Sequence, residues 1–414
     1  MCNKEMNAAD EKYMRRAIKL AKAGEGWVHP NPLVGAVIVK DGRVIGEGYH
    51  RKCGELHAER NAIAALTESA EGATIYVTLE PCCHHGKTPP CTEAIMENRL
   101  ARVVIGSRDP NPLVAGKGAR ILREAGIEVV EDFLREECDE LNPVFFHYIS
   151  TKTPYVIMKY AMTADGKIAT KTGASKWITG EDARQEVQRL RHACMGIMAG
   201  IGTVLTDDPL LNCRLETDAL PCGDSYGIRH PIRIICDSRL RIPADSQICR
   251  TAREYETIVV CADPHLPPGE QTADHPPGIN LQEHQEETMT VRIRRLRQMG
   301  ITVLNFPGEA QPDGKGQVDL KALMEHLGER GIDSILLEGG GTLNESALQA
   351  GIVGEVRAFI APKIFGGRAR TPVEGSGVET PDQAVLMHHV GTRAFGKDLM
   401  LRYVLSPAEQ IERR

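Results

Sequence analysis

The sequence lacks two features that would each point to a particular class of partner. Its 414 residues contain 50 Lys plus Arg against 56 Asp plus Glu, and no basic run stands out. A surface that binds nucleic acid or an anionic membrane through charge needs clustered Lys and Arg, so neither partner is expected. No apolar run approaches the roughly 20 residues of a membrane-spanning helix. The charged amino-terminal stretch also lacks the apolar core of a secretory signal, so we expect a cytoplasmic protein.

The remaining composition is that of a globular protein with a substantial core. Hydrophobic residues make up 42% of the chain, which is ordinary for a folded domain. A chain of this length favours two or three domains. Because no export signal is visible, the 12 cysteines are interpreted as free thiols and metal ligands rather than disulfides.

Helix-like and strand-like segments alternate through both halves, which predicts an α/β architecture. We expect a helix over 11–23 with Asp10 as its cap, and a hairpin turning at Asp41-Gly42. Further helices are expected in the first half at 55–69, at 91–100 and in the first part of 118–130. Strands are expected at 73–80, at 101–109 and at the end of 118–130. This layered unit is expected to end near Phe145 or His147, and TKTP at 151–154 then separates domain 1–150 from domain 151–414.

The second half repeats the alternation without repeating the sequence. The expected strands are 155–162, 195–200, 231–237, 257–262, 301–306, 333–340 and 356–362, and the expected helices are 182–194, 319–330 and 342–350. Two stretches, 215–230 and 263–290, are loop-like and resemble insertions, and the second is polar and rich in proline. Neither can be assigned a role from its sequence.

One histidine, one glutamate and two cysteines form the clearest chemical pattern. His57 and Glu59 stand at the start of an expected helix, Cys82 follows Pro81 at the end of a strand, and Cys91 opens the next helix. One imidazole and two thiolates bind zinc tetrahedrally and leave a fourth position for water, whose pKa the metal lowers. Glu59 could then carry a proton from that water to a leaving amine. Histidine, glutamate and a later Pro-Cys pair match the signature of zinc deaminases.

Two observations keep other interpretations of this pattern open. The deaminase signature has two residues between its cysteines, whereas eight separate Cys82 from Cys91. The neighbouring residues Cys83, His84 and His85 could instead complete a closed, four-ligand structural zinc site. In that arrangement Glu59 would have no role.

The second half lacks the G-x-G-x-x-G fingerprint of a standard dinucleotide site. It has instead a strand, the triple glycine 339–341 and a helix starting at Thr342, which would suit a phosphate group. A tight strand-to-helix turn without any ligand explains the same residues. A second glycine-containing turn lies at 198–209, where Asp207 could accept a hydrogen bond from a ribose hydroxyl.

Several motifs together resemble the bifunctional deaminase–reductases of riboflavin biosynthesis. In the first half they are NPLVGAVIV (31–39), GYH (48–50), HAE (57–59), EPCCHHGKTPPC (80–91) and DPNPLVAGKG (109–118). In the second half they are KYAMTADGKIA (159–169), SKWITG (175–180), GIGTVLTDDPLLNCR (200–214), DSRLR (237–241) and EGGGTLNES (338–346). The eight-residue gap between the cysteines is typical of this family.

The resemblance implies a cytidine-deaminase-like domain followed by a dihydrofolate-reductase-like domain. It implies a small phosphorylated pyrimidine as substrate: zinc-dependent hydrolysis would remove the 2-amino group of 2,5-diamino-6-(5-phosphoribosylamino)pyrimidin-4(3H)-one. NADPH would then reduce the ribosyl group, giving 5-amino-6-(5-phosphoribitylamino)uracil. The resemblance also implies a homo-oligomer formed through the reductase domain.

The same resemblance implies roles for individual residues. In the first domain, His57, Cys82 and Cys91 would hold Zn²⁺, Glu59 would be the acid/base, and Asn31, His50, His84, Lys87, Asp109 and Asn111 would form the pyrimidine site. In the second, Ala161, Trp177, Thr203, Asp207, Leu211, Ser238, Gly340, Gly341, Thr342, Leu343, Asn344, Glu345 and Ser346 would contact NADPH, while Ser175, Arg191, Arg214 and Glu338 would bind substrate. Lys159 would lie near the reacting carbon, and the sequence leaves open whether Lys159 or Glu338 assists proton transfer. Arg239 and Arg241 could favour a cofactor with a 2′-phosphate, and Cys83 departs from the family's usual serine.

Two other functions remain compatible with these motifs. The chain could be a nucleobase or tRNA deaminase fused to an unrelated α/β domain, or a zinc-stabilised nucleotide sensor without turnover. The wide cysteine gap, the missing basic stripe and the reductase-like second half favour the two-activity enzyme.

Overall fold

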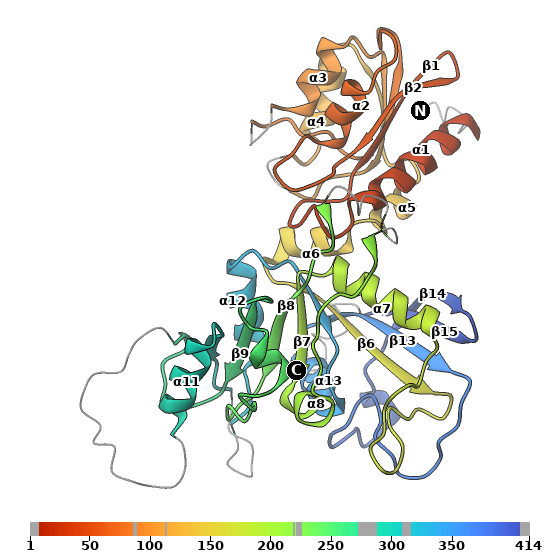
Figure 1. The fold of residues 1–414 in the computed structure, drawn as a ribbon. Helices are drawn as coiled ribbons and strands as arrows, with labels where there is room; N and C mark the ends of the chain where they lie inside the picture. Colours follow the sequence, from red (N-terminus) through yellow and green to blue (C-terminus); the bar gives the residue numbers. More distant parts are fainter. Residues whose placement is uncertain are drawn as a thin grey trace. The chain divides into compact units, whose positions relative to one another are not determined.

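The computed structural model describes residues 8–85, 89–111, 114–217, 220, 226–271, 288–308 and 316–405 (Figure 1). The chain divides into two compact units. The first contains Met1–Lys152 together with Glu216–Arg229, and the second contains Thr153–Leu215 with His230–Arg414. No helix in the described part of the chain is both long and apolar enough to cross a membrane.

The first unit is built on a five-stranded mixed sheet in the order β2-β1-β3-β4-β5. Its strands are β1 Gly35–Lys40, β2 Arg43–Tyr49, β3 Thr74–Leu79, β4 Arg102–Ser107 and β5 Glu128–Val130. The predicted hairpin is confirmed: β1 and β2 pair antiparallel around Asp41 and Gly42, which both have positive φ. β3, β4 and β5 run parallel, so their carboxyl ends share one edge of the sheet.

Helices cover both faces of this sheet. They are α1 Ala8–Ala21, η1 Lys22–Gly24, α2 Ala58–Ala64, α3 Cys91–Glu97, α4 Lys117–Glu124, α5 Arg135–Asp139 and α6 Pro143–Thr151. α2, α3 and α4 pack on one face and α1 on the other, as Figure 1 shows for the first unit. The apolar side chains of α1 that pack on the sheet are buried, namely Tyr13, Met14, Ala17, Ile18 and Ala21.

The predicted cap of the first helix is wrong. Asp10 lies inside α1, where it is buried and accepts two hydrogen bonds from Arg102 and one from Tyr76. Its carboxylate therefore ties α1 to strands β3 and β4 instead of satisfying the helix's own N–H groups. The sequence pattern cannot distinguish these roles, because both put an acidic residue in the first turn of a helix.

The second unit contains a ten-stranded sheet in the order β10-β11-β9-β8-β7-β12-β6-β13-β15-β14. Its strands are β6 Tyr155–Thr163, β7 Gly196–Gly200, β8 Ile232–Cys236, β9 Thr257–Cys261, β10 Gly269–Glu270, β11 Thr302–Asn305, β12 Ser334–Leu337, β13 Val353–Ala361, β14 His388–Phe395 and β15 Asp398–Val404. All pairs from β11 to β13 are parallel. Short apolar strands of this kind are buried on both faces.

Two groups of helices cover the second sheet. The helices are α7 Glu181–Ala193, α8 Ile201–Asp207, α10 Gln247–Arg250, α11 Met289–Gln298, α12 Leu320–Glu329 and α13 Gly341–Gln349, with the short η3 Pro381–Gln383. α12 and α13 pack on one face, and α8, α10 and α11 pack on the opposite face. The α/β class expected from the sequence is confirmed for both units.

The structure contains several elements that the sequence did not predict. The first unit extends beyond Phe145 and His147 through α6, and α2 spans only Ala58–Ala64 of the helix expected over 55–69. The hairpin β14–β15 and the helix α8 were also missed. β14 has mostly exposed side chains, so it shows no alternation of apolar and polar residues that would reveal a strand.

Candidate active sites

The first unit brings together the histidine and the two cysteines of the predicted metal site. One ligand atom from each of His57, Cys82 and Cys91 lies within 4.8 Å of the others. The imidazole Nδ1 of His57 is 3.4 Å from Cys82 Sγ and 3.5 Å from Cys91 Sγ. This trio is the sole cluster of three such donors in the described part of the chain, and Cys83, His84 and His85 do not join it.

Local structure explains why these three side chains meet. His57 is the residue before α2, Cys82 follows the end of β3, and Cys91 is the first residue of α3. The backbone N–H of Cys91 donates to Cys82 Sγ at 3.3 Å. Helix starts offer unpaired N–H groups and a positive dipole end, and both favour thiolates.

Two charged side chains hold the chain around Cys82 and Cys91 through hydrogen bonds to backbone groups. Neither of them was predicted from the sequence. Arg60 on α2 donates to the carbonyls of Pro89 and Pro90 at 2.9 and 2.8 Å, directly before Cys91. Glu80 is buried and accepts N–H bonds from Gly116 and Ala119 at the start of α4. Glu80 lies in a quoted motif and Arg60 directly follows one, but both contact the backbone of distant segments, and such contacts leave no mark in the sequence.

Burial sets the protonation of the carboxyl group beside the trio. Glu59 is 3% exposed, and this burial raises its pKa to about 7. A carboxyl group with a pKa near neutrality can both accept and release a proton, as a general acid/base must. The hydrogen bonds of Cys82 with Cys91 and His57 lower the pKa of the Cys82 thiol to about 4, so it is a thiolate.

A cavity of about 320 Å³ opens beside the trio. The predicted pyrimidine-site residues Asn31, His50, His84, Asp109 and Asn111 line it together with His57, Glu59 and Cys82. Lys87 lies outside the described residues. The loop residues Cys53, Gly54 and Glu55 also line the cavity and were not predicted.

A chain of hydrogen bonds fixes the tautomer of the buried His50. Its Nδ1 lies 3.1 Å from the Leu56 carbonyl, which can only accept, so Nδ1 carries the proton. Nε2 then accepts from the Asn31 amide at 3.1 Å. Burial lowers the pKa of His50, so the ring is neutral and Asn31 presents its carbonyl oxygen elsewhere. Burial likewise raises the pKa of Asp109, to about 6.

The second unit contains a larger cavity, of about 810 Å³, beyond the carboxyl ends of its parallel strands. Ligands of open α/β sheets bind at this edge. The predicted residues that line it are Lys159, Ala161, Ser175, Thr203, Asp207, Ser238, Glu338, Gly340, Gly341, Thr342, Leu343, Asn344 and Ser346, and Arg239 and Arg241 line it too.

Close packing explains Gly341, the first residue of α13. A Cβ on Gly341 would lie 2.4 Å from Cγ of Glu374, so no larger residue fits there without displacing that segment. The Asn344 side chain donates to the Pro372 carbonyl at 2.8 Å, while its Oδ1 is buried with no hydrogen-bond partner in the described structure. The turn thus offers backbone N–H groups to the cavity.

Three charged side chains meet at the base of this cavity. Arg191 donates to both carboxylate oxygens of Glu338, at 2.7 and 3.1 Å, and Lys159 Nζ is 3.6 Å from Glu338 Oε2. Burial alone would raise the pKa of Glu338, but the charges of Arg191 and Lys159 outweigh it and lower that pKa to about 2. Burial lowers the pKa of Lys159 more than Glu338 raises it.

Five predicted residues are not among those that line this cavity, namely Trp177, Arg191, Leu211, Arg214 and Glu345. The Trp177 side chain is 62% exposed, and the Arg184 guanidinium stacks 4.7 Å from its ring centroid. Leu211 is buried in the apolar core, while Arg214 is exposed. Arg191 is buried behind Glu338, and Glu345 accepts a hydrogen bond from Gln349.

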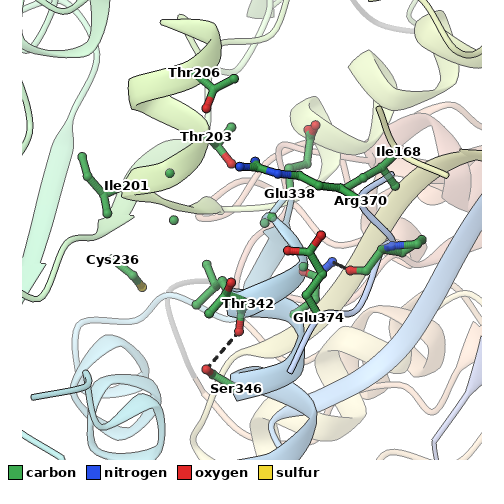
Figure 2. A pocket seen from close by; sticks show the side chains of 18 of the residues that line it. Ile168, Ile201, Thr203, Thr206, Cys236, Glu338, Thr342, Ser346, Arg370 and Glu374 are labelled. Atoms are coloured by element: carbon green, nitrogen blue, oxygen red, sulfur yellow. Dashed lines mark hydrogen bonds between the residues drawn. The ribbon is translucent and has the colours of Figure 1, made fainter. Parts of the chain in front are cut away.

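Arg370 and Glu374 line the cavity although no motif indicated them. Figure 2 shows the Arg370 side chain extending across the cavity toward Thr203 on α8, with Glu374 beside the glycine turn. The backbone carbonyl of Arg370 accepts a hydrogen bond from the Ile168 N–H, and this bond anchors the backbone at Arg370. Both residues come from an irregular segment after β13, where neither periodicity nor a turn motif marks a functional position.

The two units match two separate protein families. The family described as "Cytidine and deoxycytidylate deaminase zinc-binding region" matches residues 7–107, and the one described as "RibD C-terminal domain" matches residues 154–401. The riboflavin biosynthesis protein RibD of Actinobacillus pleuropneumoniae is 51% identical over 96% of this chain and 95% of its own. The chain belongs to the RibD family. RibD of Escherichia coli K12 is 39% identical, over 95% of this chain and 99% of its own.

Solved RibD structures have the same fold over both units. RibD of Acinetobacter baumannii superposes with a TM-score of 0.77 at 36% identity, covering 96% of this chain and 99% of that one. A deaminase/reductase from Thermotoga maritima gives 0.76 at 34% identity with the same coverage. The RibD family comprises bifunctional enzymes of riboflavin biosynthesis, with a deaminase and a reductase in one chain. The predicted family, fold class and pair of activities are therefore confirmed, and an unrelated second domain is excluded.

Proposed function

We propose that the first unit hydrolyses the 2-amino group of 2,5-diamino-6-(5-phosphoribosylamino)pyrimidin-4(3H)-one, and that the second reduces the ribosyl group of the product with NADPH. The final product is 5-amino-6-(5-phosphoribitylamino)uracil. One observation carries the first assignment: the His57, Cys82 and Cys91 donors converge within 4.8 Å beside the buried Glu59. The Thermotoga maritima protein of similar fold is named for a deaminase and a reductase of these same two substrates, which supports the assignment.

The donor set supports zinc as the resident metal of the first site. One imidazole and two thiolates are typical zinc ligands, and three protein ligands leave a position for water. When bound, zinc lowers the pKa of that water so that hydroxide is available near neutral pH. Glu59 takes the proton of the water and delivers protons to the pyrimidine ring and the leaving amine. Water thus replaces the amino group by a carbonyl oxygen, and ammonia leaves.

The polar groups around the cavity support recognition of a pyrimidine. The neutral His50 orients the Asn31 amide, leaving the Asn31 carbonyl oxygen to accept a hydrogen bond from a ring substituent. Asp109 and Asn111 also line the pocket, with the Asn111 N–H donating to Asp109 at 2.8 Å. His84 lies at the exposed rim, and Lys87, in the same loop, is proposed for the substrate phosphate.

The second cavity supports a dinucleotide cofactor. The glycine turn and the start of α13 suit a diphosphate, and Thr203 and Arg370 lie where they could bind its oxygens. Asp207 is proposed for a ribose hydroxyl, while Ser238, Arg239 and Arg241 follow β8 and would favour a 2′-phosphate, hence NADPH. The cofactor contacts proposed for Trp177, Leu211 and Glu345 require their side chains to move toward the cavity.

The charge cluster favours Lys159 over Glu338 as the proton donor. A carboxyl group with a pKa of about 2 is ionised at neutral pH and cannot donate a proton. Burial lowers the pKa of Lys159, which makes its ammonium group a better proton donor than that of an ordinary lysine. Glu338 and Arg191 then position Lys159 beside the carbon that receives the hydride. Ser175 and Arg214 are proposed to hold the substrate, with Arg191 acting through Glu338.

We also propose that the second unit forms a homo-oligomer with another copy of this chain. β14 is an edge strand of the sheet, and large apolar side chains on and beside β14 and β15 are exposed: Val385, Leu386, Met387, Val390 and Leu399. An exposed apolar edge invites pairing with a second chain. Light scattering on a size-exclusion column would test this, since Leu386→Glu should lower the molar mass of the eluting species.

The two activities are tested by following products with mass spectrometry. Zinc-loaded protein should exchange one amino group for a carbonyl without NADPH, and the product should gain two hydrogens when NADPH is added. The Glu59→Gln variant should lose deamination and still reduce the deaminated intermediate. The Lys159→Met variant should lose reduction and still deaminate the substrate. Each variant is thus the folding control for the other. Loss of both activities in either variant, or no reaction with zinc bound, would contradict the proposal.

A further inference from the structure

We infer that Tyr226 is a positioning residue of the deaminase site, although it lies in the second half of the sequence. This inference rests on the proposed deaminase function of the first unit. In the sequence, Tyr226 lies between α8 and β8, which both belong to the second unit. The segment Glu216–Arg229 that contains Tyr226 nevertheless belongs to the first unit. The 215–230 stretch has no role that its sequence indicates.

The contacts of Tyr226 are specific and converge on one loop. Its hydroxyl donates to Glu55 Oε2 at 2.7 Å. Its ring lies 5.8 Å from that of Trp27, and Lys52 Nζ stands 5.3 Å from the Tyr226 ring and 5.7 Å from the Trp27 ring. A cation shared between two aromatic rings and a charge-assisted hydrogen bond together define the position of residues 52–55.

That loop connects two groups of the deaminase site. It runs from His50, which orients Asn31, to the proposed metal ligand His57, and Cys53, Gly54 and Glu55 line the cavity. The Cys53 N–H donates to the Trp27 carbonyl at 3.1 Å, and His50 Nδ1 donates to the Leu56 carbonyl. Tyr226 therefore holds the middle of the loop, while Trp27 and His50 hold the rest.

The predicted consequence is a loss of order at the substrate side of the cavity. Without Tyr226, the carboxylate of Glu55 loses its hydrogen bond and the Lys52–Trp27 stack loses one ring. The chemistry at Glu59 does not depend on this contact, so KM for deamination should rise while kcat changes little. The reductase cavity has no lining residue from this segment among its described residues, so reduction should be unaffected.

The test uses the full-length, zinc-loaded chain and its Tyr226→Ala and Tyr226→Phe variants. Deamination and reduction are measured separately, the latter with the deaminated intermediate as substrate. We expect Tyr226→Ala to raise KM for deamination about tenfold, and Tyr226→Phe, which keeps the ring, about threefold. Tyr148→Phe on α6 is the matched control and should change neither activity.

Hydrogen exchange of residues 50–57 gives a second measurement that needs no activity. Exchange there should be faster in Tyr226→Ala than in the wild type, with zinc content unchanged. The inference would be overturned if neither KM for deamination nor hydrogen exchange changed in Tyr226→Ala. It would also be overturned if deamination and reduction fell equally, because that result indicates general unfolding. If the wild-type chain fails to deaminate, the proposed function is wrong, while the exchange result still decides whether Tyr226 orders the loop.

Discussion

Replacing Glu338 by Gln should destabilise the second unit and remove its reductase activity together. The Glu338 carboxylate is shared between Arg191 and Lys159, and all three side chains are largely buried, with 11–15% of each exposed. Gln is nearly the same size, so the change removes the negative charge and leaves packing intact. Two positive charges would then remain buried with no carboxylate between them, which is the costly way to break a buried ion pair.

The magnitude follows from the protonation of this group. The environment lowers the pKa of Glu338 from 4.5 to about 2, which corresponds to about 3 kcal/mol of stability at neutral pH. That agrees with the roughly 3–5 kcal/mol lost when one partner of a buried pair is removed. Because the folded-state pKa is the lower one, this stability is present above pH 4.5 and is lost as the pH falls toward 2.

Hydrogen exchange of the β6 and β12 amides measures the opening of the second unit separately from the first. At pH 7, the opening free energy should be about 3 kcal/mol lower in Glu338→Gln than in the wild type. The difference should shrink below pH 4.5, where the wild type itself begins to lose this contribution. Glu325→Gln, at an exposed position of α12, is the control. Equal stability of both variants at pH 7, or a pH-independent difference, would refute the role assigned to the charge cluster.

Three further changes test the supports of the two sites. Gly118→Ala should lower the zinc content of the protein, because the added Cβ would lie 2.2 Å from the Pro81 carbonyl oxygen and displace the loop that carries Cys82. Atomic emission measures the zinc content, and an unchanged value would count against this prediction. Arg60→Ala should weaken zinc affinity about 10-fold or more in a chelator competition, since it frees the loop before the third ligand. Arg370→Ala should raise KM for NADPH about tenfold, whereas the nearby Arg368→Ala should not; equal effects would remove Arg370 from the cofactor site.

The sequence by itself determined the local chemistry of both sites. His57, Glu59, Cys82 and Cys91 could be chosen because zinc accepts few ligand types and the segments around them have clear helix and strand patterns. The triple glycine between a strand and a helix likewise indicated a turn suited to a phosphate group. The resemblance to a known family then supplied the substrate and most of the residue roles.

Only the tertiary structure decided which distant residues support those sites. Asp10 joins α1 to the sheet instead of capping it, Arg370 enters the reductase cavity from an irregular segment, and Tyr226 contacts the deaminase loop from the other half of the sequence. Periodicity and capping motifs describe interactions between residues a few positions apart. Contacts between side chains far apart in the sequence depend on how complete elements pack, and no short pattern encodes them.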